Sequence, residues 1–527
     1  MAYYFFDERQ SSNDPCDAIR ATLAQLLHLN ASDSRFVIEV THHYRNSRVG
    51  QVTATNTEVM DLFVHLRTHF PSVTFIVLDG LDECDDPESM LRFAHKAASE
   101  SKETSFLFLH RPTIQFPFGI AGGELSITPS NQSNRGDIGR FALAEMQDLL
   151  RRELLPSETN IGHLAEQVAQ KANSMFLWVR LLAEYLRLPV LTLRKRIDVI
   201  ENLTRLQGLD NIYAKIWATL QTQADGPAGS TLLRIFQWAA HSRRPLGIDE
   251  LDVAITTPLD GPRDSLDAMP ALSVTLGQIT GALVELDDRG KVQFIHLSTL
   301  EYFRSLPALG ASHCAIANTC LSYLNFSVPA RPLVAVQTQP CERRNGLHAK
   351  YPLLDYSSMH WSEHLWAALV ETTDAALAGA PPLANLEHMV QLLKELIYNR
   401  DKVTMWIEAS WIFGTPPRIL APDRTVHEAT VSRDDYSQLR DDLDTLRLDL
   451  LELNGAWSSV LCAEPNEIWE PSVPSFTKSR FWVKTTASAV RPVVQSHGAP
   501  KKRSFVVQSQ ISRSGNEIGI ITVFPTQ

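Results

Sequence analysis

The sequence lacks a hydrophobic run long enough to cross a membrane. No apolar stretch reaches the roughly 18 residues that a spanning helix needs, and the start, MAYYFFDERQ, lacks the basic and apolar regions of a secretory signal. Basic charge is also scarce, because 49 lysines and arginines face 60 aspartates and glutamates, for a net charge of −11. Nucleic acids and anionic membranes attract basic surfaces, so the composition disfavours both as partners. We therefore expect a cytoplasmic protein that does not contact membranes.

Cysteines are few and scattered along the chain. They form no CxxC pair and show no zinc-ligand spacing with histidine; the six are Cys16, Cys84, Cys314, Cys320, Cys341 and Cys462. This pattern indicates free thiols in a reducing compartment. Repeats of the ankyrin, WD or tetratricopeptide kind are also missing.

The first part of the chain alternates apolar strands with amphipathic helices. Strands are predicted at residues 2–6, from residue 75 and at TSFLFLHRP, residues 104–112, with helical periodicity between them. The order strand, helix, helix, strand, helix, strand is typical of a doubly wound parallel sheet. The length of 527 residues allows roughly three or four domains in all.

The rest of the chain is predicted to be mainly helical. ADGPAGS, residues 224–230, is a plausible boundary, and the pattern after it gives two helices, then a short strand running into a helix, which suggests a winged helix. The predicted fold class is multidomain α/β plus α. The predicted parts are an incomplete α/β domain at 1–130, a helical domain at 135–223, a winged helix at 225–310, a helical region at 311–450 and a β-leaning tail at 451–527.

FIVLDGLDECDDPES, residues 75–89, places four apolar residues before five carboxylates that fall within residues 79–86. A carboxylate at the tip of a buried strand can orient Mg²⁺, and a nearby one can position water beside a phosphate. Asp79 is the candidate metal ligand, and Asp82 and Glu83 are the candidate catalytic acids. The alternative is a solvated acidic loop that caps the next helix through Asp86 or Ser89. The helix and the arginine-ended strand that follow favour the nucleotide fold.

The phosphate-binding loop of such a fold is absent from the sequence. A GxxxxGK[ST] loop would hold phosphates with its backbone N–H groups and its lysine. Gly50 is the only glycine before Gly80, and the one GK pair, Gly290 with Lys291, precedes a valine.

Several motifs together resemble those of fungal NACHT-domain proteins, which are signal-transducing P-loop NTPases similar to innate immune receptors. In order, they are FIVLDGLDEC, a strand ending in RP, KANSMFLWVRLL, LQGLDNIY, AAHSRRPLGIDELDVAI and VQFIHLSTLEYF. The resemblance covers roughly residues 1–370. It implies a nucleotide-dependent switch in which diphosphate holds the core and the winged helix together, and triphosphate releases them.

The resemblance also implies roles for single residues. Residues 75–84 would be the Walker B segment, with Asp79, Asp82 and Glu83 as its acids. Arg111 would sense the γ-phosphate, although relatives read TSRP where this chain reads LHRP. His296 would contact bound diphosphate, and a structural histidine at a strand end is the alternative. The implied cofactors are Mg²⁺ with ATP and ADP or with GTP and GDP.

Two functions stay open. In the family the Walker A loop precedes the YFFD strand, so this chain is expected to begin after that loop or to be a degenerate copy, and normal binding or hydrolysis of nucleotide is not expected. The first possibility is therefore that the protein derives from the regulatory NTPase switch and is inactive as a nucleotide-binding protein. The second is a nucleotide-independent interaction scaffold that binds other NACHT proteins or copies of itself. Whether the chain is an enzyme is undecided, and the winged-helix arginines Arg243 and Arg244 are not expected to bind DNA.

Overall fold

The structure is a computed structural model. It describes residues 1–6, 13–47, 55–70, 72–111, 134–223, 227–264, 268–269, 272–309, 312–333, 340–377, 386–420, 434–469, 473, 477, 479–483, 506–511 and 518–523. The chain divides into two compact units, Met1–Ser130 and Asn131–Gln527. Helices predominate, beside a small parallel sheet, so the predicted fold class, α/β plus α, is confirmed.

The first unit contains a three-stranded parallel sheet. Its strands are β1 (Ala2–Phe5), β2 (Thr74–Asp79) and β3 (Thr104–Leu109), in the order β1-β2-β3. The register pairs Phe5 with Asp79 and Asp79 with Leu109, so the carboxyl ends of all three strands lie together. The three predicted strands and their parallel arrangement are thereby confirmed.

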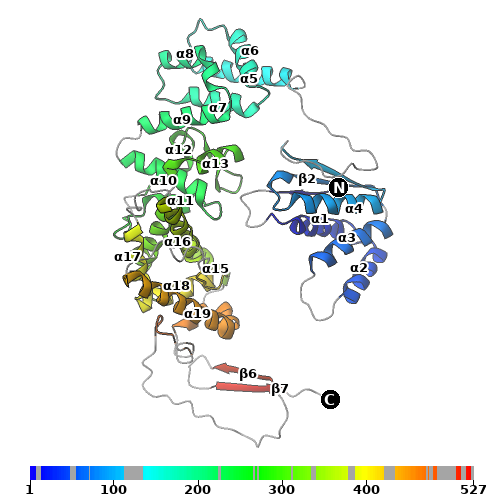
Figure 1. Ribbon diagram of the computed structural model, residues 1–527, viewed down its shortest axis with the longest axis vertical. Coiled ribbons are helices and arrows are strands. Elements are labelled where there is room, and N and C mark those ends of the chain that lie inside the picture. The colour runs from blue at the N-terminus through cyan, green and yellow to red at the C-terminus, as the bar shows by residue number, and fades with distance from the viewer. Residues whose placement is uncertain are drawn as a thin grey trace, which may run out of the picture. The chain divides into compact units, whose positions relative to one another are not determined.

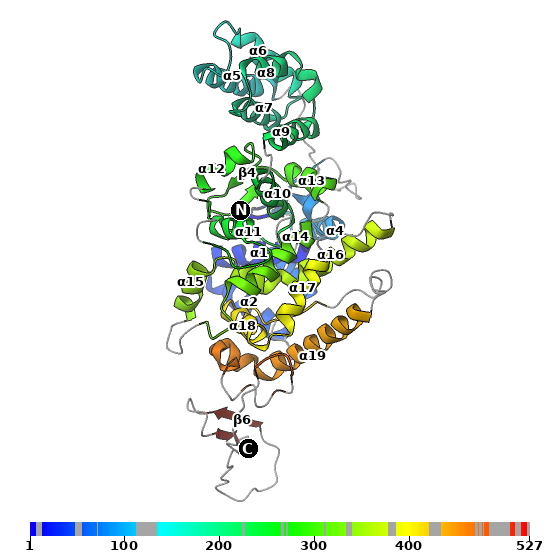
Figure 2. The same cartoon turned by 90° about the vertical axis from the view of Figure 1, so that its left-hand side faces the viewer.

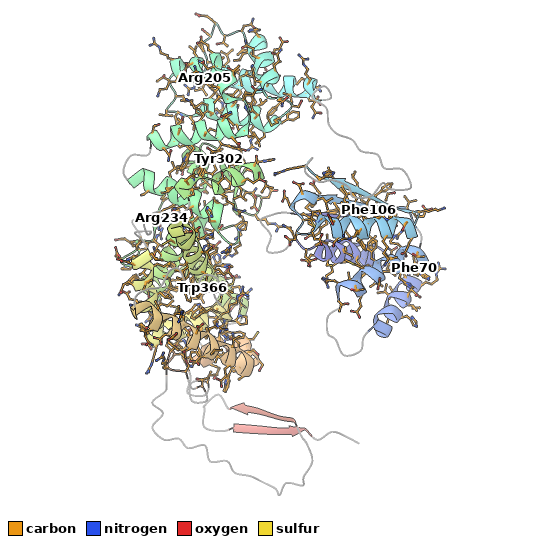
Figure 3. All side chains as sticks on the ribbon, in the orientation of Figure 1. Phe70, Phe106, Arg205, Arg234, Tyr302 and Trp366 are labelled. Atoms are coloured by element: carbon orange, nitrogen blue, oxygen red, sulfur yellow. The ribbon has the colours of Figure 1, made fainter. Side chains whose placement is uncertain are left out.

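Three helices cover one face of this sheet. The helices of the unit are α1 (Pro15–Leu29), α2 (Ser34–Ser47), α3 (Asn56–His69) and α4 (Pro87–Glu100), and α1, α3 and α4 lie on the same side of the strands (Figure 1). Ile76 and Leu78 of β2 are buried beneath them. Phe106 of β3, labelled in Figure 3, meets the ring of Phe93 of α4 edge-on.

The opposite face of the sheet is apolar and exposed. The residues that alternate with the buried ones, Tyr3, Phe5, Phe75, Leu107 and Leu109, are each about half exposed. Tyr3, Val77 and Leu107 form one row across the three strands. Parallel sheets in proteins are normally covered on both faces. Among the residues that the structure describes, this sheet is covered on one face only, so the unit buries less apolar surface than a parallel sheet usually does.

Residues 1–130 should be less stable than residues 225–310. The sheet has one exposed apolar face and two edge strands, whereas the winged-helix region shares a larger core. Limited proteolysis of the whole chain with two proteases of different specificity, followed by mass spectrometry, should place the earliest cuts in residues 1–130. Earliest cleavage within 225–310 by both proteases would contradict this.

The second unit begins with five helices and continues into a helical module with a two-stranded wing. The five are α5 (Arg135–Arg151), α6 (Ile161–Lys171), α7 (Phe176–Arg187), α8 (Leu193–Glu201) and α9 (Leu209–Gln223). The module contains α10 (Pro227–His241), α11 (Ile248–Thr256), α12 (Leu272–Ile279), β4 (Val284–Leu286), β5 (Val292–Phe294) and α13 (Leu297–Arg304), with β4 and β5 antiparallel. Trp217, Phe236, Phe294 and Phe303 pack their rings together and join α9, α10, β5 and α13.

More helices extend the same core. They are α14 (Ser312–Ser322), α15 (Pro340–Lys350), α16 (Leu354–Leu377), α17 (Leu386–Ile397), α18 (Arg400–Ile412) and α19 (Asp434–Ala463), with a π-helical turn, Tyr323–Ser327, after α14. Figure 2 shows α14, α16, α17 and α18 in one group, with α19 beside α18. One continuous core reaches from Ile138 to Trp482.

The predicted boundary between residues 450 and 451 falls inside α19. Leu446, Leu450 and Leu453 of this helix are buried and follow helical spacing, which carries the helix past Gly455 to Ala463. Phe481 and Trp482 also belong to the helical core. Strands of the predicted β-leaning tail occur further on, as the antiparallel pair β6 (Val506–Ile511) and β7 (Ile518–Val523). No helix in the described ranges is long and apolar enough to span a membrane.

Candidate functional site

The candidate site is the edge of the sheet where the three parallel strands end. Asp79 is the last residue of β2, and Gly80 follows with φ of 72°, in the left-handed region that suits glycine. A Cβ atom at residue 80 would lie 2.8 Å from the carbonyl oxygen of Phe6. The Phe6 N–H donates to the Asp79 carbonyl oxygen at 2.9 Å, so the end of β1 fixes the turn that starts the acidic loop.

Two of the predicted site residues, Asp82 and Arg111, contact each other. Asp82 lies in a 3-10 turn, Leu81–Glu83, directly above the end of β2. Its Oδ1 accepts the backbone N–H of Arg111 at 3.1 Å, and its Oδ2 lies 3.3 Å from the Arg111 Nε. The Asp82 side chain is 12% exposed and that of Arg111 is 40% exposed. The acidic loop after β2 is therefore connected to Arg111, two residues beyond the end of β3.

Asp79 and Glu83 occupy the same edge and are both partly buried. Asp79 is adjacent to Phe5 and Leu109 across the sheet and has the same strand parity as the exposed apolar face. Over the described ranges, no group of three or more histidine, cysteine or acidic side chains is arranged to hold a metal ion. Mg²⁺ commonly takes only one or two carboxylates and completes its shell with water and phosphate. The assignment of Asp79 to a metal therefore stays a prediction.

The remaining acids of the loop have structural contacts. Asp86 is the N-cap of α4, and hydrogen bonds from the Ser89 hydroxyl at 2.6 Å and the Ser89 backbone N–H at 3.0 Å hold the pKa of its carboxyl below the usual value. Asp85 Oδ2 accepts the Asn13 N–H at 3.2 Å, and the Asp85 N–H donates back to the Asn13 carbonyl at 3.1 Å. The capping alternative is thus correct for Asp86. Burial raises the pKa of the neighbouring Cys84 thiol to about 11, so this thiol stays protonated near neutral pH.

His296 belongs to the second unit, whereas the acidic edge belongs to the first. It is the N-cap of α13, and its Nδ1 accepts the Ser298 backbone N–H at 3.0 Å. A neutral imidazole that accepts at Nδ1 carries its proton on Nε2. The Ser298 hydroxyl lies 2.8 Å from the same Nδ1 and 2.9 Å from the Tyr213 hydroxyl. These contacts give His296 a capping role, the structural alternative that the sequence left open.

The sequence did not reveal the partners of the two winged-helix arginines. Arg244 contacts the carboxylates of Glu250 and Asp355 at 2.7 and 2.9 Å, and Arg243 Nε lies 3.5 Å from Glu363. Asp355 and Glu363 stand more than 110 positions later, so local spacing gives no signal for these pairs. Both arginines thus have carboxylate partners within the chain.

Comparisons with known proteins identify two domains. Residues 1–111 match the family described as Nephrocystin 3, N-terminal, and residues 224–316 match the one described as GPI inositol-deacylase, winged helix domain. The second match confirms the predicted winged helix. Both domains are found in NACHT-type proteins. No curated protein matches the chain.

Proposed function

We propose that this protein is a NACHT-type signalling protein derived from a nucleotide-dependent switch. The observation that carries the proposal is the convergence of Asp79, Asp82 and Arg111 on the carboxyl edge of a parallel sheet. Ligands of open α/β sheets bind at this edge. The pairing of this sheet with a winged helix, a combination of domains found in NACHT-type proteins, supports the same proposal.

The residues at this edge fit an Mg²⁺ ion better than they fit a nucleotide's phosphates. Asp79 and Glu83 offer carboxylate oxygens, which are the ligands that Mg²⁺ prefers. The proposed phosphate contact is Arg111, whose guanidinium is already paired with Asp82. The sequence has no GxxxxGK[ST] loop to supply further N–H donors. When bound, Mg²⁺ would neutralise phosphate charge; Asp79 would orient its water ligands, and Glu83 would polarise a water molecule.

Nucleotide binding to the purified chain tests this proposal. We expect weak, Mg²⁺-dependent binding of fluorescent ATP, ADP, GTP or GDP, lost in Asp79→Ala because that variant removes the strand-tip carboxylate. Glu88→Gln is the matched control: Glu88 lies on α4, exposed, and pairs only loosely with Arg92 at 3.4 Å. Binding unchanged in Asp79→Ala would contradict the role of this edge. If neither the wild type nor the two variants bind nucleotide, nucleotide dependence is no longer part of the proposed function.

A second candidate function is a nucleotide-independent interaction scaffold. The observation that favours it is the exposed apolar face formed by Tyr3, Phe5, Phe75, Leu107 and Leu109. Apolar patches of this kind often mark surfaces that contact other proteins. Partners would be other NACHT proteins or further copies of this chain. This candidate is supported over the first if the protein does not bind nucleotide and still associates with such a partner in nucleotide-free buffer with EDTA.

A further inference from the structure

A group of histidines, of which His364 is fully buried and His241 and His313 are partly buried, lies where the winged helix meets the helices that follow it. His241 ends α10, His313 lies in the first turn of α14, and His364 lies in the middle of α16. The ring centroids of His241 and His313 are 5.2 Å apart, and those of His313 and His364 are 5.0 Å apart. Trp366, two residues beyond His364, marks this part of α16 in Figure 3. None of these residues belongs to the acidic edge of the first unit.

Hydrogen bonds connect two of these histidines, His313 and His364, with Tyr356 and with the backbone of Arg243. The backbone N–H of Arg243, just after α10, donates to the Tyr356 hydroxyl oxygen at 2.9 Å. The Tyr356 hydroxyl lies 2.7 Å from His364 Nε2, and His364 Nδ1 lies 2.8 Å from His313 Nδ1. A tyrosine hydroxyl has one proton to donate. If it donates to His364 Nε2, His364 carries its own proton on Nδ1 and donates to His313.

The direction of these hydrogen bonds also determines which nitrogen of His313 carries the proton. His313 accepts at Nδ1 and carries its proton on Nε2, which lies 4.0 Å from Glu371 Oε1. The opposite direction would leave the Tyr356 hydroxyl proton without an acceptor in this set, which is costly because Tyr356 is fully buried. Each histidine of the chain must be neutral, because a protonated imidazole donates from both nitrogens and accepts from neither.

The surroundings disfavour positive charge on these rings. Burial lowers the pKa of His241 to about 4 and that of His313 to about 3, and it places the pKa of His364 well below the usual value. Arg243 and Arg304 add to this effect. Their guanidinium groups face the cluster from the turn after α10 and from α13, where Arg304 Nε donates to the Ala240 carbonyl at 3.0 Å.

The other titratable groups nearby do not provide a negative charge that would stabilise protonated histidines. Glu371 of α16 has its carboxylate 4.0 Å from His313 Nε2, and burial raises its pKa to about 7. Glu363 contacts His360 at 3.1 Å and Arg243 at 3.5 Å. The thiol of Cys314 in α14 and the hydroxyl of Tyr356 stay protonated near neutral pH because burial raises the pKa of each. His241 Nε2 and Glu371 Oε2 are buried without a hydrogen-bond partner among the described residues.

We propose that the hydrogen-bonded series Arg243–Tyr356–His364–His313, which we call the fastener, holds the end of the winged helix against α14 and α16 at neutral pH. Acidification protonates the histidines and releases this contact. In the closed form the histidines are neutral and hydrogen-bonded or buried. Once the helices separate, solvated histidines titrate near pH 6.5 and take up protons that the closed form excludes. The proposal does not depend on nucleotide binding, because none of its residues belongs to the acidic edge.

The direction of the pH effect follows from linkage. A histidine with a lowered pKa favours the closed form above about pH 6.5, and this preference is lost as the pH falls. Glu371 acts in the opposite sense, since its raised pKa lets the closed form hold a proton below about pH 7. Three histidines outweigh one carboxyl, so we expect the open population to rise roughly 40-fold between pH 7.5 and 5.5.

Hydrogen exchange of the full chain tests the fastener in its wild-type form. The reporter is the peptide containing the Arg243 amide, and a peptide from α7 (Phe176–Arg187), whose segment contains no histidine, is the internal reference. After correction for intrinsic exchange, protection at Arg243 should fall roughly 40-fold from pH 7.5 to 5.5 relative to α7. Protection that keeps a constant ratio to α7 over this range would overturn the proposal.

Two matched variants sharpen the test. His364→Gln removes one titrating ring, so the same pH change should alter protection only roughly 4-fold. His360→Gln is the control: His360 also lies on α16, with its ring 4.8 Å from that of Tyr356, but it pairs with Glu363 outside the chain of bonds. It should keep the wild-type pH dependence. An equal effect of both variants would show that the chain of bonds has no special role. If His364→Gln does not fold, the pH dependence of protection at Arg243 relative to α7 in the wild type still tests the proposal.

Discussion

Replacement of Phe303 by alanine should lower the free energy of unfolding of the winged-helix region by about 4 kcal/mol. Phe303 is fully buried, and its ring lies 4.4 Å from that of Phe236 and 5.5 Å from those of Phe294 and Trp217. Removal of the ring takes away these contacts and leaves a cavity among four elements that cannot all move inwards. The loss should appear as faster hydrogen exchange of the α10 amides at moderate urea, measured on the full chain.

A partly exposed aromatic residue provides the control for this substitution. Phe176, at the start of α7, packs near Phe141 and keeps about two fifths of its surface in water. Phe176→Ala should cost less than about 1 kcal/mol, since little buried area is lost. A loss of similar size in both variants would mean that the aromatic cluster of α9, α10, β5 and α13 does not stabilise the winged helix as its geometry indicates.

Arg244→Met should cost about 3 kcal/mol at pH 7.5, because it removes the closest cation of the buried Glu250 and leaves the longer contact of 3.6 Å to Lys291. Glu250 is completely buried, and its two oxygens lie 2.7 and 2.9 Å from the Arg244 guanidinium nitrogens. Burial raises the pKa of Glu250, but hydrogen bonds and charge from Arg244 more than offset this, so the pKa is lowered overall. The pair therefore stabilises the fold above about pH 4.5, and that contribution is lost at lower pH.

The pH dependence of this variant is a second signature. Without Arg244, burial should raise the pKa of Glu250, so the cost of the variant should shrink as the pH falls toward 5. The double variant Arg244→Met with Glu250→Gln should be more stable than Arg244→Met alone, because the uncharged amide can still accept the Gly247 N–H. Arg243→Met, which loses one longer contact to Glu363, should cost under about 1 kcal/mol. All three proteins can be compared by urea unfolding; equal losses for Arg243 and Arg244 would contradict the argument.

The sequence predicted elements whose signal is local. The strands β1 to β3 are short apolar runs bounded by polar residues, and their parallel order follows from the helices between them. The helix α2 was missed, since residues 37–41 read VIEVT, which is rich in β-branched residues. The helix α19 was ended too early because the stretch from about Gly455 is richer in proline, serine and valine and leans towards strands, whereas buried leucines on one face continue the helix.

Contacts between distant residues could not be predicted from the sequence. The Asp82–Arg111 pair depends on the crossover that brings the end of β3 beside the loop after β2. The bonds from Arg243 to Tyr356 and from His313 to His364 depend on how α14 and α16 pack against the end of α10. Spacing along the chain carries no information on either, because both are set by tertiary packing.

The position of Trp482 in the helical core has a consequence for synthesis on the ribosome. The three strands of the first unit are complete once Leu109 has emerged, whereas the core of the second unit needs Trp482, whose neighbour Val483 bonds through its N–H to Thr404 of α18 at 3.0 Å. Translation at about 5–20 residues per second separates the two events by tens of seconds. During that interval the first unit carries its apolar sheet face on an unfinished chain. Nascent-chain chaperones should therefore bind while residues 131–482 are still being made.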